Sequence, residues 1–324
     1  MNPHRWPITT IGKLVDVARG SSPRPIADQR YFVGGTIPWI KIADATKSGK
    51  YLYETNEKVN EFGASFSKLL PAGSLIIAAS GTLGYTQLLG VPGCVHDGWL
   101  YVTNLRGIDR DFLYYFFQLK KQHFYNSAYG AAIQNINTEI LRNTEIPLPP
   151  LSLQKRIGET LSAYDDLIEN NTRRIKILEQ MAQMLCREWF IHLRFPGHGK
   201  VKLVQSDLGQ VPDGWTVSTL GEVAAVNELS IKNDAPKEIS YVDIASVSTG
   251  SIDAVTKLPF SEAPGRARRV VREGDTIWAT VRPNRRSFAL ILRPEADLIV
   301  STGFAVLTPK TIPYSYLYFA ITTD

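Results

Sequence analysis

Residues 146–192 read IPLPPLSLQKRIGETLSAYDDLIENNTRRIKILEQMAQMLCREWFIH, and this stretch decides the fold. It opens with three prolines in four positions, which cannot continue a preceding strand or helix. Ser152 is a suitable N-cap, and between it and His192 there is no proline and a single glycine, Gly158. We predict a helix of about 40 residues here, which is about 60 Å long at roughly 1.5 Å per residue.

Apolar residues recur along the predicted helix in alternating steps of four and three. This 3.5-residue spacing continues over more than four heptads and is typical of a coiled coil. The predicted seam consists of Ile157, Leu161, Tyr164, Ile168, Asn171, Ile175, Leu178, Ala182, Leu185 and Trp189. Asn171 is the polar seam position, and such a residue fixes register and partner in coiled coils. An ordinary amphipathic core helix is the alternative, but the length and strict spacing favour a seam that needs a partner helix.

The segments on either side of this helix repeat each other. Five stretches of the first segment return in the same order in the second, which indicates two copies of one domain. The period is far longer than that of a solenoid. The matching pairs are Trp6–Gly12 with Trp215–Gly221, Ile40–Asp44 with Val242–Ser246, Leu70–Ala78 with Val271–Ala279, Gly98–Val102 with Gly303–Leu307, and Phe112–Phe116 with Tyr316–Ala320.

Within each copy, short apolar runs bounded by Gly, Pro and Asp predict strands. The predicted fold class is therefore α+β, with two tandem β-rich domains linked by a long coiled-coil-type helix. We place the first domain at 1–150, the helix at 151–195, a linker at 196–214 and the second domain at 215–324. The second copy stops soon after its last matching segment, so we expect it to lack its own exit and helix. The partner helix is then expected from the missing C-terminal part or from another chain.

Composition sets wider limits on function. The 324 residues include 36 basic and 31 acidic side chains, a mild excess that fits nucleic-acid binding only slightly better than other roles. Cys94 and Cys186 form no CxxC motif, so neither a disulfide framework nor a metal site is expected. There is no signal peptide and no apolar run long enough to span a membrane. We expect a soluble cytoplasmic protein.

Two β-rich domains with a proline-rich exit and a long helix resemble the specificity subunits of type I restriction-modification systems. The stretches that carry the resemblance are the openings Trp6–Gly12 and Trp215–Gly221, Gly34–Ile40, the loop Ser80–Gly84, Gly130–Asn137 with Ile140–Asn143, and the junction Ile146–Ile157. The resemblance covers nearly the whole chain. The second copy departs from it in having Thr280–Asn284 in place of the Gly-Thr-x-Gly loop.

The resemblance implies a division of labour among several chains. Each copy would be a target recognition domain that reads one half of a split site in double-stranded DNA. The long helix, paired with a partner helix, would set the distance between the halves. Two methyltransferase subunits would hold S-adenosylmethionine and modify an adenine, and a restriction/translocase subunit would join for cleavage. The chain itself would bind no cofactor and would not be an enzyme.

Candidate DNA-binding residues are polar side chains on loops, since base reading needs several donors or acceptors aimed at a groove. In the first copy they are Ser21, Ser22, Arg24, Lys41, Lys47, Ser80, Thr82, Gln134, Asn135 and Asn137. In the second copy they are Arg266, Arg268, Arg269, Arg282, Asn284, Arg285 and Arg286. Residues 264–286 hold seven arginines against Glu273 and Asp275, a net charge of +5. A solvated basic loop, turns and caps are the structural alternatives, and Trp39 and Trp99 are predicted to be core.

Enzyme functions lack their motifs in this sequence. Leu148–Leu151 lacks the polar residue and the aromatic of an adenine methyltransferase motif, Pro212-Asp213 has no following Glu-x-Lys of a nuclease, and there is no Walker loop. Two non-enzymatic alternatives stay open. One is the specificity module of a type IIB/IIG-like restriction system, and the other is a coiled-coil scaffold whose β-rich domains bind protein.

Overall fold

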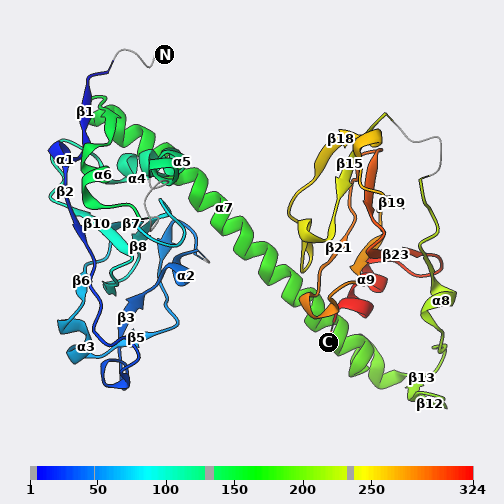
Figure 1. The fold of residues 1–324 in the computed structure, drawn as a ribbon. Helices are drawn as coiled ribbons and strands as arrows, with labels where there is room; N and C mark the ends of the chain where they lie inside the picture. Colours follow the sequence, from blue (N-terminus) through cyan, green and yellow to red (C-terminus); the bar gives the residue numbers. More distant parts are fainter. Residues whose placement is uncertain (1–5, 47, 128–134, 232–236, 324) are drawn as a thin grey trace. The chain divides into compact units, whose positions relative to one another are not determined.

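The computed structural model describes residues 6–46, 48–127, 135–231 and 237–323 (Figure 1). The chain divides into two compact units, Met1–Arg174 (unit 1) and Ile175–Asp324 (unit 2). The division falls inside the helix α7, Leu151–Cys186, so the two ends of this helix belong to different units. The domain borders placed at residues 150, 195 and 214 stay predictions.

Unit 1 is built on two sheets. The larger has the strand order β2-β10-β7-β8-β4, with β2 at Asp16–Arg19, β10 at Trp99–Thr103, β7 at Leu75–Ala78, β8 at Thr86–Leu89 and β4 at Tyr51–Leu52. The smaller has the order β5-β3-β9-β6, with β5 at Lys58–Val59, β3 at Ile37–Ile40, β9 at Gly93–Val95 and β6 at Lys68–Leu70.

Short helices and a two-stranded ribbon complete unit 1. β1 (Ile8–Thr10) pairs with β11 (Glu145–Pro147), which ties the start of the unit to its proline-rich exit. The helices are α1 at Ile11–Leu14, η2 at Gln29–Tyr31, α2 at Ile42–Ala45, α3 at Glu61–Ser65, α4 at Arg110–Leu119, α5 at Lys121–Ser127 and α6 at Thr138–Asn143.

Unit 2 repeats the two sheets of unit 1. One has the order β14-β23-β20-β21, with β14 at Ala224–Val226, β23 at Phe304–Pro309, β20 at Thr276–Ala279 and β21 at Phe288–Leu290. The other has the order β18-β15-β22-β19, with β18 at Thr256–Pro259, β15 at Glu238–Val242, β22 at Leu298–Ser301 and β19 at Ala267–Val270.

The remaining elements of unit 2 are short. The strand pairs β12 (Leu203–Ser206) with β13 (Gly209–Pro212) and β16 (Val247–Ser248) with β17 (Ser251–Ile252) form separate ribbons. The helical segments are η3 at Arg187–Ile191, η4 at His198–Lys200, α8 at Leu220–Val223, η5 at Ile244–Ser246, η6 at Phe260–Glu262, η7 at Pro283–Arg285 and α9 at Tyr314–Thr322.

The pairing of the strands confirms the repeat and the predicted fold class. β3 runs parallel to β9 with Ile40 opposite Val95, and β15 runs parallel to β22 with Val242 opposite Val300. The other strands of the smaller sheet join in the same order and direction in both units, as do four strands of the larger sheet. Within the described part of the chain, the edge strand β4 of unit 1 has no counterpart in the larger sheet of unit 2. Residues 40–44 are therefore equivalent in structure to 242–246, as the sequence repeat predicts.

The two tryptophans predicted to be core are core. Trp39 is 1% exposed and Trp99 is fully buried. The indole Nε1–H of Trp99 donates to the carbonyl oxygen of Ile40 at 3.0 Å, so its only polar atom is satisfied inside unit 1. Neither ring is accessible for stacking on a base.

The N-cap of α7 differs from the predicted Ser152. The helix starts at Leu151, so Ser152 lies in the first turn and is not the N-cap; the first acceptor is the carbonyl of Pro150, which receives the N–H of Gln154 at 3.0 Å. Proline suits this place because its missing N–H has no helical partner there. After Cys186 the turn η3 widens into a π-helix, and the helical run ends at Ile191.

Polar contacts hold the first turns of α7 on unit 1. The buried side chain of Gln154 accepts from the N–H of Asp109 at 2.8 Å and donates to the carbonyl of Pro149 at 2.8 Å. One turn on, a Cβ at Gly158 would lie 3.0 Å from that of Asp111, so only glycine allows this close approach. The helix is therefore fitted closely to the unit.

A buried lysine continues this contact. The side chain of Lys50 is 3% exposed, forms an ion pair with Asp111 at 2.7 Å and donates to the hydroxyl of Ser162 on α7. The phenol of Tyr115 donates to Asp165 of α7 at 2.6 Å. These bonds fix one face of the helix over three turns.

After α7, the turn η3 and the segment that follows it pack on unit 2 through aromatic rings instead. The ring of Phe190 lies 4.5 Å from that of Tyr316 in α9 and 5.8 Å from that of Trp215, measured between centroids. The ring of Phe195 stacks on Trp215 at 5.4 Å. Such contacts stabilise by apolar burial and tolerate small shifts better than hydrogen bonds do.

Candidate functional site

Each unit has a loop at the same place in its frame, after the central strand of the larger sheet. In unit 1 the loop follows β7, and the N–H of Ala79 donates to the carbonyl of Gly98 at 2.8 Å. In unit 2 the loop follows β20, and Thr280 donates to Gly303 at 2.9 Å. The predicted sites Ser80 and Thr82 lie in the first loop, and Arg282, Asn284 and Arg285 lie in the second.

In unit 1 the polar residues near this loop are joined to one another around Asp97. The hydroxyl of Ser22 donates to the Asp97 carboxylate at 2.9 Å, and Arg24 forms an ion pair with the same group. Arg19 donates to the carbonyl of Asp97 at 3.0 Å and to the side chain of Asn135 at 3.0 Å. Three predicted site residues therefore belong to one network.

Within this network the charge of Arg24 is balanced by Asp97, whereas Arg19 donates only to neutral oxygen atoms. Burial raises the pKa of Asp97, but the Ser22 hydrogen bond and the Arg24 guanidinium outweigh it and hold that pKa below its usual value. Burial lowers the pKa of the neighbouring His96, whose Nδ1 accepts from the N–H of Gly98 at 2.8 Å. Arg24 therefore contributes little unbalanced positive charge to this site.

Other candidates of unit 1 have structural partners or are simply exposed. Asn137 accepts from the N–H of Ile140 at 2.8 Å and so caps α6. Lys41 forms an ion pair with Glu57. Ser21 and Thr82 are exposed. Lys47 and Gln134 lie outside the described residues.

In unit 2 the equivalent place is an open groove with a volume of about 460 Å³. Three of the predicted arginines line it, which are Arg266, Arg282 and Arg285. Its other lining residues are Asp243, Ile244, Ala245, Val281, Ser301, Thr302 and Gly303. Arg282 and Arg285 are exposed, and within the described part of the chain their guanidinium groups have neither a hydrogen bond nor an ion pair.

Other arginines of residues 264–286 make contacts within unit 2. Arg268 donates to the carbonyl of Ala267 at 3.0 Å and lies over the ring of Phe260. Arg269 donates to Ser230 at 3.3 Å. Arg286 donates to the carbonyl of Thr322 at 2.8 Å and so ties the loop to the end of α9. The seven clustered arginines of the sequence thus serve different roles.

The polar partners around Asp97 were missed by reasoning from the sequence. Arg19 lies at the end of strand β2, where a lone arginine gives no signal of its partners. Asp97 could have been found from the repeat, because the match of Gly98 with Gly303 places it opposite Thr302. Unit 1 has an acidic residue at this position and unit 2 has a neutral one, so the two units differ in charge beside the loop.

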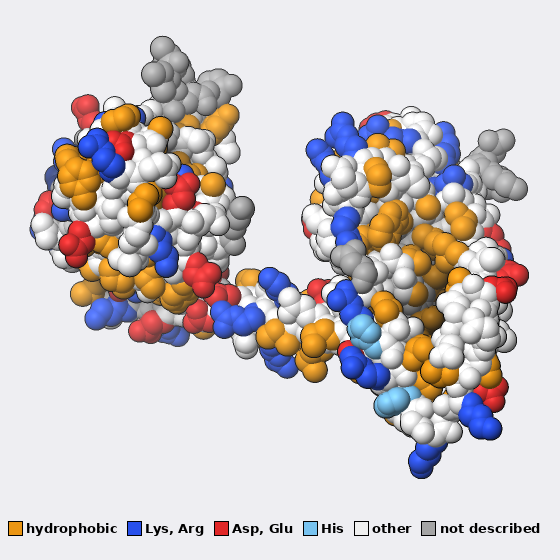
Figure 2. Space-filling model, turned by 90° about the horizontal axis from the view of Figure 1, so that it is seen from below, with side chains coloured by type: hydrophobic (Ala, Val, Ile, Leu, Met, Phe, Trp, Pro, Cys, Tyr) orange, Lys and Arg blue, Asp and Glu red, His pale blue; other side chains and the backbone are white. Residues whose placement is uncertain are grey.

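The predicted seam of α7 is exposed over most of its length, and Figure 2 shows apolar side chains open along the helix. Tyr164 is 63% exposed, Ile168 62% and Ile175 57%, and Leu161, Leu178 and Leu185 are also open to solvent. Asn171 is exposed between them. At the ends, Ile157 packs against the core of unit 1, and Ala182 and Trp189 are half-buried in unit 2.

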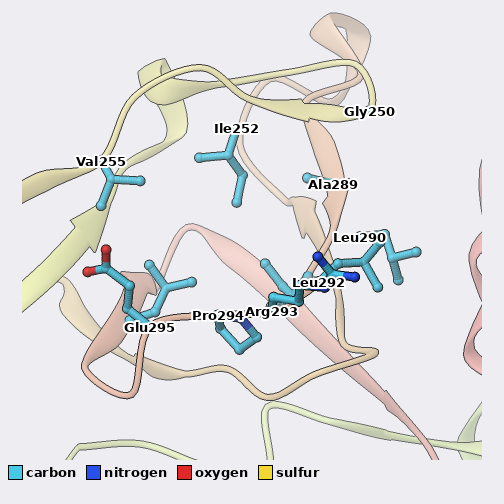
Figure 3. A pocket seen from close by; sticks show the side chains of 11 residues that line it. Gly250, Ile252, Val255, Ala289, Leu290, Leu292, Arg293, Pro294 and Glu295 are labelled. Carbon is cyan, nitrogen blue, oxygen red and sulfur yellow. The ribbon is translucent and has the colours of Figure 1, made fainter. Parts of the chain in front are cut away.

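A second hollow in unit 2 lies away from the basic groove. Figure 3 shows Ile252 and Val255 on one side of it and Pro294 and Glu295 on the other. Glu295 is already paired with Lys257 at 2.9 Å. Its mainly apolar lining offers no row of free donors, so it is not a candidate for binding a charged polymer.

The described residues contain no group of three His, Cys, Asp or Glu side chains that could bind a metal ion. None of their helices is both long and apolar enough to cross a membrane.

Comparison with known proteins places these features in a family. The model of the type I restriction modification DNA specificity domain matches residues 3–180, which is more than half of the chain. That match contains unit 1 and most of α7.

Curated relatives and a solved structure extend the match. The chain is 28% identical over 252 residues to the type I restriction enzyme MjaIX specificity subunit and 24% identical over 290 residues to the MjaVIII specificity subunit, both of Methanocaldococcus jannaschii. These alignments cover 76% and 87% of this chain but only 57% and 65% of those proteins. A crystal structure of the type I restriction-modification S subunit from M. genitalium matches 97% of this chain and 75% of its own, at 17% identity and a TM-score of 0.55. The last likeness concerns the fold.

Proposed function

The chain belongs to the type I restriction modification DNA specificity family, and from this premise we propose that it reads a bipartite target in double-stranded DNA, one half with each unit. The observation that carries the proposal is the duplication of a loop in a shared frame of two sheets. Two equivalent sites on one chain suit a target with two defined halves, as dimeric DNA readers bind two half-sites at a fixed spacing. The continuous helix α7 is the element that would set this spacing.

The proposed role is recognition without catalysis. The chain would direct two methyltransferase subunits, which hold S-adenosylmethionine, to an adenine of the target, and a restriction/translocase subunit would join for cleavage. This assembly would act in the cytoplasm. In support, the cationic and amide side chains near the two loops are of the kinds that contact phosphates and base edges.

We propose that the exposed seam of α7 pairs with a partner helix. Large apolar side chains at 3.5-residue spacing are stable in water only when another helix covers them. The partner is either a further segment of the same protein or a helix of another chain. Asn171, in the middle of the seam, would fix the register of this pair.

The test is the pattern of DNA methylation in cells. The chain is expressed with its cognate methyltransferase subunit, and host DNA is sequenced for N6-methyladenine. We expect a methylated motif that consists of two short defined half-sites separated by a gap of fixed length. An intact purified complex that leaves no methylated motif would contradict the proposal, and binding that does not weaken with salt would favour a protein-binding scaffold.

A further inference from the structure

The loops Ser80–Gly84 of unit 1 and Val281–Arg286 of unit 2 both have a left-handed residue at the second and the last position, but they differ in these residues and the second loop is one residue longer. In unit 1 the second and last loop positions are Gly81 and Gly84, with φ of +67° and +73°. In unit 2 the corresponding positions, counted from the paired strands, are Arg282 and Arg286, with φ of +54° and +50°. This left-handed region favours glycine, and a long side chain there is unfavourable.

One of these two arginines is explained by the fold. Arg286 donates to the carbonyl of Thr322 at 2.8 Å, and its guanidinium lies 6.0 Å from the ring of Phe288. It therefore connects the loop to α9 and to the sheet, and these contacts offset the unfavourable backbone.

Arg282 has no such explanation. Its side chain is exposed, and in the described parts of the chain it makes no hydrogen bond or ion pair. Glycine occupies the equivalent position of unit 1, so the frame does not need a side chain there. A strained residue whose side chain does nothing for the fold points to a function of that side chain.

The surroundings of Arg282 define what it can bind. It lines the basic groove with Arg266 and Arg285. The one carboxylate in the lining, Asp243, is engaged elsewhere, because it accepts from the N–H of Ser246 at 3.0 Å and faces Arg266 at 3.8 Å. Thr302 stands where unit 1 has Asp97. The Arg282 guanidinium is thus left free, whereas Arg24 of unit 1 is neutralised.

We propose, on the basis of the DNA-reading function above, that Arg282 is a specificity-determining residue that recognises guanine in one half of the target. An arginine held in place presents two parallel N–H donors to O6 and N7 of guanine, and this fork is the commonest specific contact to a base. A phosphate contact needs only positive charge, which an unstrained surface lysine supplies equally well. Pro283 follows directly and restricts the backbone of Arg282, which fixes the point from which the side chain leaves the loop.

The chain offers a matched control. Arg293 is also an exposed arginine of unit 2 with a left-handed backbone, φ +51°, but it lies beside the hollow of Figure 3 and not in the basic groove. Arg293→Gly removes the same charge and relieves the same backbone strain as Arg282→Gly. Any effect of charge or strain alone appears in both variants.

The experiment maps N6-methyladenine in cells that express the methyltransferase subunit with the unaltered chain, Arg282→Gly, Arg282→Lys or Arg293→Gly. For Arg282→Gly we expect one guanine of one half-site to become degenerate, with discrimination at that position falling about tenfold or more. The other half-site stays intact. The urea midpoint of Arg282→Gly equals or exceeds that of the unaltered chain, which separates this effect from misfolding. Arg293→Gly leaves the motif unchanged.

Three outcomes overturn the proposal. In the first, Arg282→Gly retains the full motif. In the second, it lowers methylation equally at every site without relaxing any position, and Arg282→Lys restores it, as expected of a phosphate contact. In the third, Arg293→Gly relaxes the same position. If the unaltered chain gives no motif at all, the proposed DNA-reading function itself fails, which is a different result from these three.

Discussion

The two units share a frame and differ in how they use their charged groups. Around the loop of unit 1, Arg24 is neutralised by Asp97, and the loop has glycine at both left-handed positions. Around the loop of unit 2 the equivalent of Asp97 is Thr302, and Arg282 is free in the groove. The sheets therefore fix where the loop lies, whereas single loop residues decide what it can bind. Two loops of different chemistry suit two half-sites of different sequence.

The two units also differ in the contacts that they make with the long helix. Unit 1 holds the helix through buried hydrogen bonds and the ion pair of Lys50, whereas the helical turn η3 packs on unit 2 through aromatic rings. Buried polar contacts demand one geometry, because each unsatisfied group is costly. We therefore expect unit 1 to be the more sensitive of the two to single substitutions at the helix.

The largest effect is expected from Lys50→Ala. The substitution leaves Asp111 partly buried with only Arg110 as a partner, and breaking a buried ion pair costs about 3 kcal/mol. Urea denaturation should show unit 1 destabilised by this amount. Lys41→Ala is the matched control, because its pair with Glu57 is exposed, and it should cost less than about 1 kcal/mol. Equal effects of the two variants would remove the contrast between the helix attachments.

The next largest effect is expected when the left-handed glycines of the unit 1 loop are replaced by arginine, the residue at the equivalent positions of unit 2. A Cβ at Gly84 would lie 3.3 Å from the carbonyl oxygen of Lys121, so Gly84→Arg should cost about 2 kcal/mol from strain and crowding. The nearest atom to a Cβ at Gly81 is 3.7 Å away, on Ile42, so Gly81→Arg should cost only about 1 kcal/mol. Urea midpoints of the two variants check this order, and a larger cost for Gly81→Arg would mean that the loops are not equivalent.

A smaller effect is the change in the stability of each unit with pH, which has opposite signs in the two units. Burial raises the pKa of Asp275 above 3.8, so its folded form favours the proton, and this group stabilises unit 2 as the pH falls from the raised pKa towards 3.8. In unit 1 the pKa of Asp111 is lowered: burial raises it, but Lys50 and Arg110 outweigh burial. Its contribution is present above 3.8 and is lost as the pH falls below that value through the folded pKa.

The measurement is urea unfolding at a series of pH values from about 6 to about 3, the range in which carboxyl groups titrate. Pulse-labelling hydrogen exchange reports each unit separately. Asp275→Asn should abolish the gain of unit 2 just above pH 3.8 and leave the acid loss of unit 1 unchanged. The equivalent residue of unit 1 is Ser74, which does not titrate in this range. The same gain in both units would contradict the assignment to Asp275.

The sequence predicted the parts of this molecule that repeat or are periodic. The seam spacing located α7, and the match of residues 40–44 with 242–246 agrees with the register of the sheets. It could not sort the arginines of 264–286, because the partners of Arg269 and Arg286 come from distant segments. It also could not show that Arg282 has the backbone of a glycine, since this depends on the loop geometry shared with unit 1.

The smallest effect on stability is expected from substitutions of seam residues that are exposed to solvent. Ile168 and Ile175 are 62% and 57% exposed, so changing either to Gln should alter the free energy of unfolding by less than about 0.5 kcal/mol. Ile157 belongs to the same seam but packs against the core of unit 1, so Ile157→Gln should cost about 2 kcal/mol. The two exposed variants should instead weaken co-purification with the chain that supplies the partner helix, because they remove apolar area from the pair. If Ile168→Gln and Ile175→Gln leave assembly intact, another surface must join the chains, and the exposed seam loses its proposed role.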